Sequence, residues 1–420
     1  MGPSDKSSKN LYKLFFFIQI MNCIQCKGKY LCSRNFCPFQ VNYKTIEKDH
    51  FNGNSPPQVF IGSKLYPRAN VGILSPPEQT EDSWIYNSPN CWTQNNYTIN
   101  EIVNLRKNLI NSRFQTSIKQ SSKFLDISRE IAMSYKPVDV EIELKKKPIV
   151  NQKFDTINMP INISSPLKQV KITSNPKIHQ KVDKVVDDID LKANQAILYL
   201  KDHFDEHFLT QLISIGVLGL KHNRKLVPTR WSITLIDDVI GKDLIKNIKN
   251  YSTIDGYRLY QGNYFGNYYF IMLFSEMFSY ELFESYLPGA IWNFSGKIEI
   301  ATDYEDYYGR KTYASNTAGG YYASRFSILS YLNKIKKQAS ILAIRFETPE
   351  YTTSLGVWVC RNAGKLTMEN EYYKFDNKEE MLNYVRAIIL RKFKYDIQDI
   401  YKKSILLNKL KTQSKLTNFL

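Results

Sequence analysis

Four cysteines near the N-terminus constrain this chain more than any other feature. Cys23, Cys26, Cys32 and Cys37 follow the spacing C-x2-C-x5-C-x4-C, and Gly28 allows the backbone to turn between the two pairs. Four thiolates so close in sequence can complete a tetrahedron around Zn²⁺ and leave no open coordination position. The spacing therefore predicts a structural zinc rather than a catalytic one. An iron–sulfur cluster and a metal-free segment are the alternatives.

Composition sets the class of protein. The chain has 420 residues and is 43% hydrophobic, enough for two or three domains, or for one large domain with a tail. Cys91 and Cys360 stand alone, as expected for reduced thiols inside a cell. The apolar run over residues 11–20 is too short to span a membrane, and Met21 is a plausible natural start after an extension or cloning remnant. We expect a cytoplasmic protein without a membrane partner.

The charge balance favours a polyanionic partner. The 57 Lys and Arg residues exceed the 40 Asp and Glu residues, giving a formal net charge of +17. Such an excess is typical of nucleic-acid-binding proteins, which gain affinity by releasing counterions. A Lys-, Ile- and Asn-rich composition from an A+T-rich genome is the competing explanation.

Hydrophobic periodicity predicts a mixed α+β protein. Alternation over residues 138–144 indicates a half-exposed strand, and helical spacing favours helices over 98–115, 121–135, 190–204, 320–338 and 377–393. We predict strand, acidic turn and helix over 230–251, paired strands over 256–274, and strands over 340–347 and 355–363. The expected layout is an extension (1–20), a zinc knuckle (21–45), an N-terminal α+β domain with a Pro-rich connection (46–180), a C-terminal α+β domain (181–405) and a flexible tail (406–420). His203 and His207 are one helical turn apart, but their phenylalanine neighbours favour packing over metal binding.

Three stretches carry more polar chemistry than packing requires. They are "YPRAN", "VPTRWSITLIDD" and the segment 303–325, whose Gly-Gly pair opens a predicted helix. Backbone N–H groups at such a helix start can hold phosphate, although the chain has no Walker loop. An aromatic-rich surface loop with a helix cap, or a surface that stacks the bases of single-stranded DNA, would also account for these residues. The candidate phosphate or nucleic-acid ligands are Arg68, Arg230, Arg310, Lys311, Tyr313, Asn316, Thr317 and Arg325.

Several motifs together resemble a known family. The stretches "CIQCKGKYLCSRNFCP", "PPQVFIGSKLYPRANVG", "KPVDVE", "VPTRWSITLIDD", "YLPGAIWN" and "TAGGYYASR" occur in the order typical of the archaeal NreA family of DNA repair proteins, and the match extends over residues 21–420. The resemblance implies two adjoining domains, work on damaged DNA and cooperation with the sliding clamp PCNA. It implies no settled catalytic mechanism.

The resemblance also gives a meaning to the C-terminal "QSKLTNFL". Members of the family often end in a clamp-binding motif of the form Q-x-x-h-x-x-aromatic-aromatic. Gln413, Leu416 and Phe419 match this motif, whereas Leu420 replaces the second aromatic residue. One helical turn would place the three apolar side chains on one side, where they can fill a groove of the partner. The alternative is a terminal helix that packs on its own domain.

Three functions remain open from the sequence. The first is a zinc-containing repair factor that is tethered to PCNA and binds DNA or a nucleotide. The second is an enzyme, either a nuclease using Mg²⁺ or Mn²⁺ or a nucleotide-dependent transferase. The third is a scaffold without catalysis. The candidate catalytic carboxylates are Asp237, Asp238, Asp303 and Glu305.

Overall fold

Two β-sheets organise the chain. The computed structural model describes residues 48–150, 163–293 and 295–412. The first sheet has the strand order β1-β5-β7-β4-β3-β2, with β6 paired to β7, and its neighbours run antiparallel except for β4 and β7. Its strands are β1 (His50–Ser55), β2 (Val59–Ile61), β3 (Arg68–Ser75), β4 (Ile110–Ser117), β5 (Val138–Leu144), β6 (Ile149–Val150) and β7 (Ile163–Ile172).

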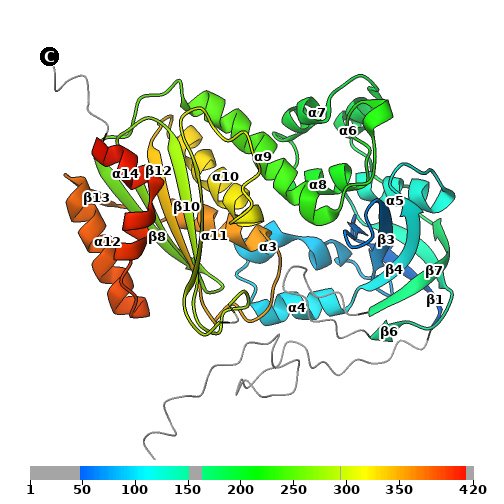
Figure 1. Cartoon of the computed structure of the whole chain (residues 1–420). Helices are drawn as coiled ribbons and strands as arrows, with labels where there is room; N and C mark the ends of the chain where they lie inside the picture. Colours follow the sequence, from blue (N-terminus) through cyan, green and yellow to red (C-terminus); the bar gives the residue numbers. More distant parts are fainter. Residues whose placement is uncertain (1–47, 151–162, 294, 413–420) are drawn as a thin grey trace, which may run out of the picture.

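The second sheet lies at the opposite end of the molecule (Figure 1). Its order is β11-β10-β12-β9-β8-β13, and within this sheet β10 and β12 are the one parallel pair among the described strands. A two-residue turn at Phe265 and Gly266, both with positive φ, joins β8 to β9. The strands are β8 (Tyr257–Tyr264), β9 (Asn267–Phe274), β10 (Ser279–Tyr286), β11 (Glu299–Glu305), β12 (Ser340–Glu347) and β13 (Tyr373–Phe375).

Helices cover both faces of the second sheet (Figure 1). On one face lie α9 (Thr229–Ile248), α10 (Ala318–Lys334) and α11 (Trp358–Glu369); on the other lie α12 (Lys378–Phe393), α13 (Gln398–Lys403) and α14 (Ile405–Thr412). No helix among the described residues is both long and apolar enough to cross a membrane. The other helices are η1 (Ser83–Asn87), α3 (Pro89–Gln94), α4 (Ile99–Lys107), α5 (Lys123–Met133), α6 (Gln180–Asp187), α7 (Ala193–Leu200), α8 (Glu206–Ser214) and η2 (Lys221–Asn223).

One hydrophobic cluster continues through both halves. It joins Val71 and Val140 of the first sheet to Ile236 of α9 and Ile341 of β12, all of which are fully buried or nearly so. A smaller cluster packs Trp92 of α3 against Trp358 of α11, with ring centroids 5.7 Å apart. The two sheets are therefore held together by shared core residues.

Several sequence predictions are confirmed. The fold is mixed α+β, and β5 alternates between buried and half-buried positions as its pattern predicts. The helix predicted from residue 98 does start there, with Thr98 as its cap, since the Thr98 side chain accepts from the Glu101 backbone in a capping box. The cysteine knuckle at 21–45 lies outside the described residues, as does the segment after Thr412.

Four predictions of local structure are wrong. The helix predicted over 98–115 ends at Lys107, and residues 110–117 form strand β4 instead. The segment 230–251 belongs to α9, one continuous helix, and the segment 355–363 leads into α11 instead of forming a strand. The polar region after residue 148 contributes β7, which lies between β5 and β4 inside the first sheet. Buried Val170 and Leu167 supply the apolar face that the prolines and lysines of this segment obscure in the sequence.

Candidate functional site

Arg325 is the centre of the candidate site. It projects from α10, its side chain is 1% exposed, and it donates to both carboxylate oxygens of Glu305 on β11 at 3.0 Å. Its other terminal nitrogen lies 2.7 Å from Asp238 on α9. Gly241 leaves room for this guanidinium, because a Cβ there would be 3.3 Å from its nitrogen. Three of the predicted site residues thus form one ion network rather than a surface open to phosphate.

Asp303 takes the position where a bound phosphate was predicted. One of its oxygens accepts from the backbone N–H groups of Asn316 and Thr317 at 3.0 and 2.9 Å, and from the Thr317 hydroxyl at 2.9 Å. Arg310 pairs with its other oxygen at 3.1 Å and also donates to the Tyr304 carbonyl of β11 and to the Tyr313 carbonyl of the loop that follows β11. The donors at the start of α10 are therefore satisfied by a carboxylate of the chain itself.

Asp237 belongs to a second buried network. It is fully buried on α9 and accepts from Arg361 of α11 at 2.9 Å, while its second oxygen has no hydrogen-bond partner among the described residues. Burial raises the pKa of Asp237, and the charge of Arg361 opposes that rise. Next to it, Lys365 pairs with Glu206 of α8 at 2.8 Å. Asp237 and Asp238 point to different arginines, as neighbours on a helix must.

These four carboxylates do not converge on a common point. Each of Asp237, Asp238, Asp303 and Glu305 has an arginine partner. Within the described residues, no group of three acidic, histidine or cysteine side chains is placed to hold a metal ion. His207 is half-buried and its ring nitrogen lies 2.6 Å from the amide of Asn87. Desolvation lowers the pKa of His207 to about 4. His207 is thus packed, as the sequence favoured, whereas His203 is exposed.

Sequence reasoning missed a third network under α10. Arg345 on β12 contacts Glu284 of β10 and lies 2.6 Å from Glu347, and all three side chains are buried. Gly320 packs directly on it, since a Cβ there would be 2.1 Å from a Glu284 oxygen. Gly320, the second glycine of "TAGGYYASR", is thus needed for close packing over a carboxylate. Two charged residues inside the apolar run "SILAIRFE" were the available signal.

A group of aromatic and basic side chains remains exposed beside these networks. Arg230 and Trp231 start α9, and the Trp231 ring lies 5.0 Å from that of Tyr66, measured between centroids. Tyr313 stacks on Tyr322, with ring centroids 5.4 Å apart. Partial burial raises the pKa of Tyr313, and the Thr234 hydrogen bond and the charge of Arg230 oppose this rise. We call Tyr66, Arg68, Arg230, Trp231, Lys311 and Tyr313 the aromatic–basic surface; all six are exposed.

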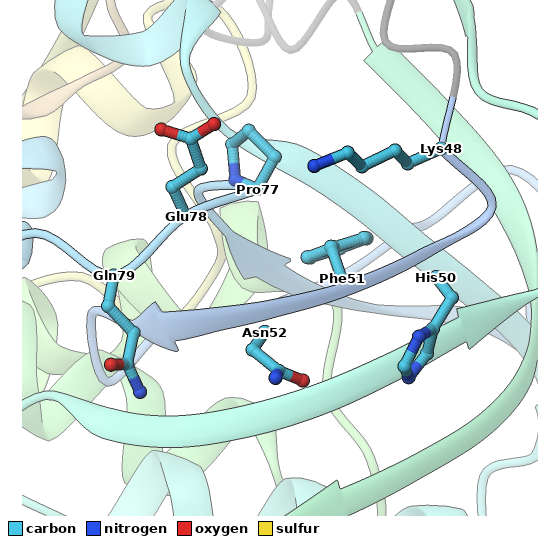
Figure 2. Close-up of a pocket in the computed structure, with 7 residues that line it drawn as sticks. All are labelled: Lys48, His50, Phe51, Asn52, Pro77, Glu78 and Gln79. Atoms are coloured by element: carbon cyan, nitrogen blue, oxygen red, sulfur yellow. The ribbon is translucent and has the colours of Figure 1, made fainter.

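A pocket of ≈ 440 Å³ lies away from these residues, at β1 (Figure 2). Figure 2 shows His50 and Asn52 on the other side of β1 from Phe51. His50 pairs with Glu141 of β5 at 3.1 Å. No residue predicted from the sequence to bind a ligand lines this pocket, and the candidate site remains the one around Arg325. The pocket is lined by Lys48, His50, Phe51, Asn52, Pro77, Glu78 and Gln79.

The remaining predicted sites are not described. The candidate metal ligands Cys23, Cys26, Cys32 and Cys37, and the candidate clamp ligands Gln413, Leu416, Phe419 and Leu420, lie outside the described residues. Helix α14, which precedes the candidate clamp ligands, is held by hydrogen bonds to the second sheet. Buried Glu281 of β10 accepts from the Ile405 and Leu406 backbone N–H groups at 2.9 and 3.1 Å, and also from the Ser404 hydroxyl. These bonds fix the start of α14.

Comparison with known proteins confirms the family resemblance. Residues 31–293 match "Archaeal Nre, N-terminal" and residues 305–419 match "Archaeal Nre, C-terminal". The chain is 36% identical over 369 residues to "DNA repair protein NreB" of Archaeoglobus fulgidus, covering 87% of this chain and 92% of the relative. It is 33% identical over 377 residues to "DNA repair protein NreA" of the same organism, covering 86% of this chain and 92% of that relative.

A relative from another archaeon agrees. "DNA repair protein NreA" of Haloferax volcanii is 32% identical over 343 residues, which are 79% of this chain and 82% of the relative. No solved structure gives a significant match. With the two family regions in order along nearly the whole described chain, the protein belongs to the archaeal Nre family.

Proposed function

We propose that this protein is a DNA repair factor that binds DNA through its aromatic–basic surface and the sliding clamp PCNA through its C-terminal motif. The names of the relatives support the repair role. The net charge of +17 supports a polyanionic partner. The observation that carries the proposal is the set of exposed rings and cations that remains once the buried arginines are paired with carboxylates.

Trp231, Tyr66 and Tyr313 are the stacking groups of this surface. Bases of unpaired DNA stack on such rings, and nearby cations hold the phosphates. Arg230, Arg68 and Lys311 supply those cations, and none of the three forms an ion pair with a described residue. Arg310 holds the loop that carries Lys311 and Tyr313 by donating to its carbonyls.

The clamp tether rests on the position of the motif. Helix α14 ends at Thr412, with Leu406 and Leu407 buried against the second sheet, and Gln413 follows directly. The predicted tail of 406–420 thus begins with a packed helix, and the motif proper follows directly after this helix in the sequence. Leu416, Phe419 and Leu420 supply the apolar side chains that would enter a groove of the clamp.

Calorimetric titration into PCNA tests the tether. Phe419→Ala removes the largest apolar contact and should weaken binding by roughly tenfold or more, as expected for a buried aromatic anchor. Asn418→Ala, at a position the motif leaves free, is the matched control and should bind as the wild type does. Equal binding by the Phe419→Ala and wild-type proteins, or no binding by either, would contradict the clamp role of this segment.

The cysteine knuckle is proposed to hold a structural zinc. Its support is the spacing of Cys23, Cys26, Cys32 and Cys37, which suits four thiolate ligands. Metal analysis of the purified protein should find about one zinc per chain. Cys26→Ser should lower that content, whereas Cys91→Ser, which changes an isolated cysteine, should not. Iron in place of zinc would favour a cluster instead.

The geometry gives less support to a nuclease or transferase. The four candidate carboxylates are each engaged by an arginine, and the donors at the start of α10 are engaged by Asp303. Turnover of DNA that depends on Mg²⁺ or Mn²⁺ and disappears in an Asp238→Asn variant would restore the enzyme hypothesis.

A further inference from the structure

A groove on the far face of the second sheet is independent of the surface described above. It has a volume of ≈ 780 Å³ and lies between strands β8 and β9 and helix α12, on the face opposite α9 and α10. Tyr384, Ala387, Ile388 and Arg391 form its wall at helical spacing on α12. The complete lining is Gln261, Gly262, Asn263, Tyr268, Tyr269, Phe270, Tyr373, Tyr384, Ala387, Ile388, Arg391 and Lys392.

Tyrosine rings dominate the accessible part of the groove. Tyr373 is 45% exposed and Tyr384 is 37% exposed, and their ring centroids are 5.6 Å apart. Tyr384 is supported from behind by Phe375 at 5.4 Å. Tyr268 forms part of the floor, held by hydrogen bonds of 3.0 Å from its hydroxyl to Glu350. Because water still reaches the rings of Tyr373 and Tyr384, packing of the hydrophobic core does not account for them.

The groove also carries positive charge and free amides. Lys392 lies 4.1 Å above the centroid of the Tyr268 ring, and neither Lys392 nor Arg391 has a carboxylate within 4.0 Å among the described residues. The side-chain amides of Gln261 and Asn263 form no hydrogen bond with another described residue. Rings, unpaired cations and free amides are the three elements that contact bases, phosphates and base edges.

We propose that this groove is a second nucleic-acid site, which holds a short stretch of single-stranded DNA. Bases would stack on Tyr373 and Tyr384, phosphates would contact Arg391 and Lys392, and Gln261 and Asn263 would face base edges. Duplex DNA keeps its bases stacked inside and cannot offer them to these rings, so the occupant is unpaired. An acidic peptide would use the cations but leave the rings unused. This proposal rests on the proposed function, because the choice of DNA as the bound polymer follows from the proposed role in DNA repair.

Fluorescence anisotropy with a labelled oligothymidylate tests the groove in the full chain. Tyr384→Ala should weaken binding about tenfold, the loss typical of one stacked base. Tyr384→Phe keeps the ring and should bind as the wild type does. The double change Arg391→Glu, Lys392→Glu should weaken binding further and reduce its salt dependence. Lys246→Glu, an exposed and unpaired cation of α9 on the other face, is the charge control and should have little effect.

Photocrosslinking adds a direct readout of contact. An oligonucleotide carrying iodouracil should crosslink to Tyr373 or Tyr384, identified by mass spectrometry. If Tyr384→Ala binds as tightly as Tyr384→Phe and no crosslink reaches either tyrosine, the groove proposal is wrong even where Trp231→Ala still lowers affinity. If the double charge reversal loses affinity but Tyr384→Ala does not, the groove is a polyanion site without stacking, and the proposal is also overturned. A wild-type protein that binds no DNA at all would overturn the proposed function as well.

Discussion

Buried arginines, each shared between two carboxylates, distinguish the second half of this protein. Arg325 faces Glu305 and Asp238, and Arg345 faces Glu284 and Glu347. A buried ion is stable only when paired, but one guanidinium offsets only one of two carboxylates. The second carboxylate must reach water or gain a proton. Asp238 is partly exposed and binds Lys242 at 2.6 Å, whereas Glu347 is buried.

Glu347 should therefore make the stability of the protein depend on pH. Burial raises the pKa of Glu347 from 4.5 to about 7, and Glu284 adds to the rise. Because the folded protein keeps this proton to a higher pH than the unfolded chain does, the contribution of Glu347 to the unfolding free energy should fall as pH rises from 4.5 to about 7, by roughly 3 kcal/mol at most. Glu347→Gln keeps the shape and removes the titration, so urea unfolding of the variant should vary less with pH over this range.

A second carboxylate gives the control for this experiment. Glu143 of β5 is partly exposed and pairs with Lys168, whereas Glu347 is buried. Glu143→Gln should leave the pH dependence as in the wild type. An identical pH profile for Glu347→Gln and the wild type would show that Glu347 stays ionised beside Arg345.

At the scale of elements, α9 and α11 show what sequence patterns can miss. The β-branched run "SITLI" favours a strand, and Asp237-Asp238 resembles a turn. In the fold Ile236, Asp237, Ile240 and Gly241 lie on the buried side of one helix. Asp237 is tolerated there because Arg361 meets it, and Gly241 because Arg325 passes over it. Asp237 and Arg361 are 124 residues apart in sequence, and Asp238 and Arg325 are 87 residues apart. Local patterns carry no information about such pairings.

Other parts were predictable because their signals are local. The alternation of β5 and the start of α4 at Thr98 need only neighbours in sequence. Residues of the segment 303–325 also lie together in the fold, since the loop and α10 both contact β11. The role of these residues was not predictable from the sequence. The packing of β11 determines whether Asn316 and Thr317 donate to a bound phosphate or to Asp303. Only the fold decides that.

Gly320 tests how tightly α10 packs on the buried network. An alanine Cβ would lie 2.1 Å from the Glu284 carboxylate, which must then move away from Arg345. The helix itself gains about 1 kcal/mol from Gly→Ala, but the displaced ion pair costs more, so Gly320→Ala should destabilise the protein by about 1–3 kcal/mol. Gly62→Ala is the control, since its nearest atoms are 3.6 Å away. Equal stability of the two variants in denaturant titration would mean that Glu284 is not held in place.

At the scale of the whole molecule, the proposed contacts are carried by one connected body. The hydrophobic cluster that joins the two sheets fixes α9, and with it Arg230 and Trp231. Glu281 fixes α14 on the second sheet, so the motif beginning at Gln413 is attached at a defined point. Two weak contacts on one rigid body reinforce each other when both partners lie on the same DNA, because the second contact forms at high effective concentration.

This coupling predicts different losses on free DNA and on DNA that carries the clamp. Phe419→Ala should leave affinity for free DNA unchanged but lower affinity for clamp-loaded DNA by about a hundredfold, the scale on which linked contacts exceed single ones. Trp231→Ala should lower both affinities, by about tenfold on free DNA. Trp84→Ala is matched in exposure, 42% against 41%, and lies outside the aromatic–basic surface, so it should change neither. Surface plasmon resonance on DNA with and without clamp measures all four proteins. If Phe419→Ala lost affinity equally on both surfaces, the terminal segment would be acting on DNA directly and the tether would be wrong.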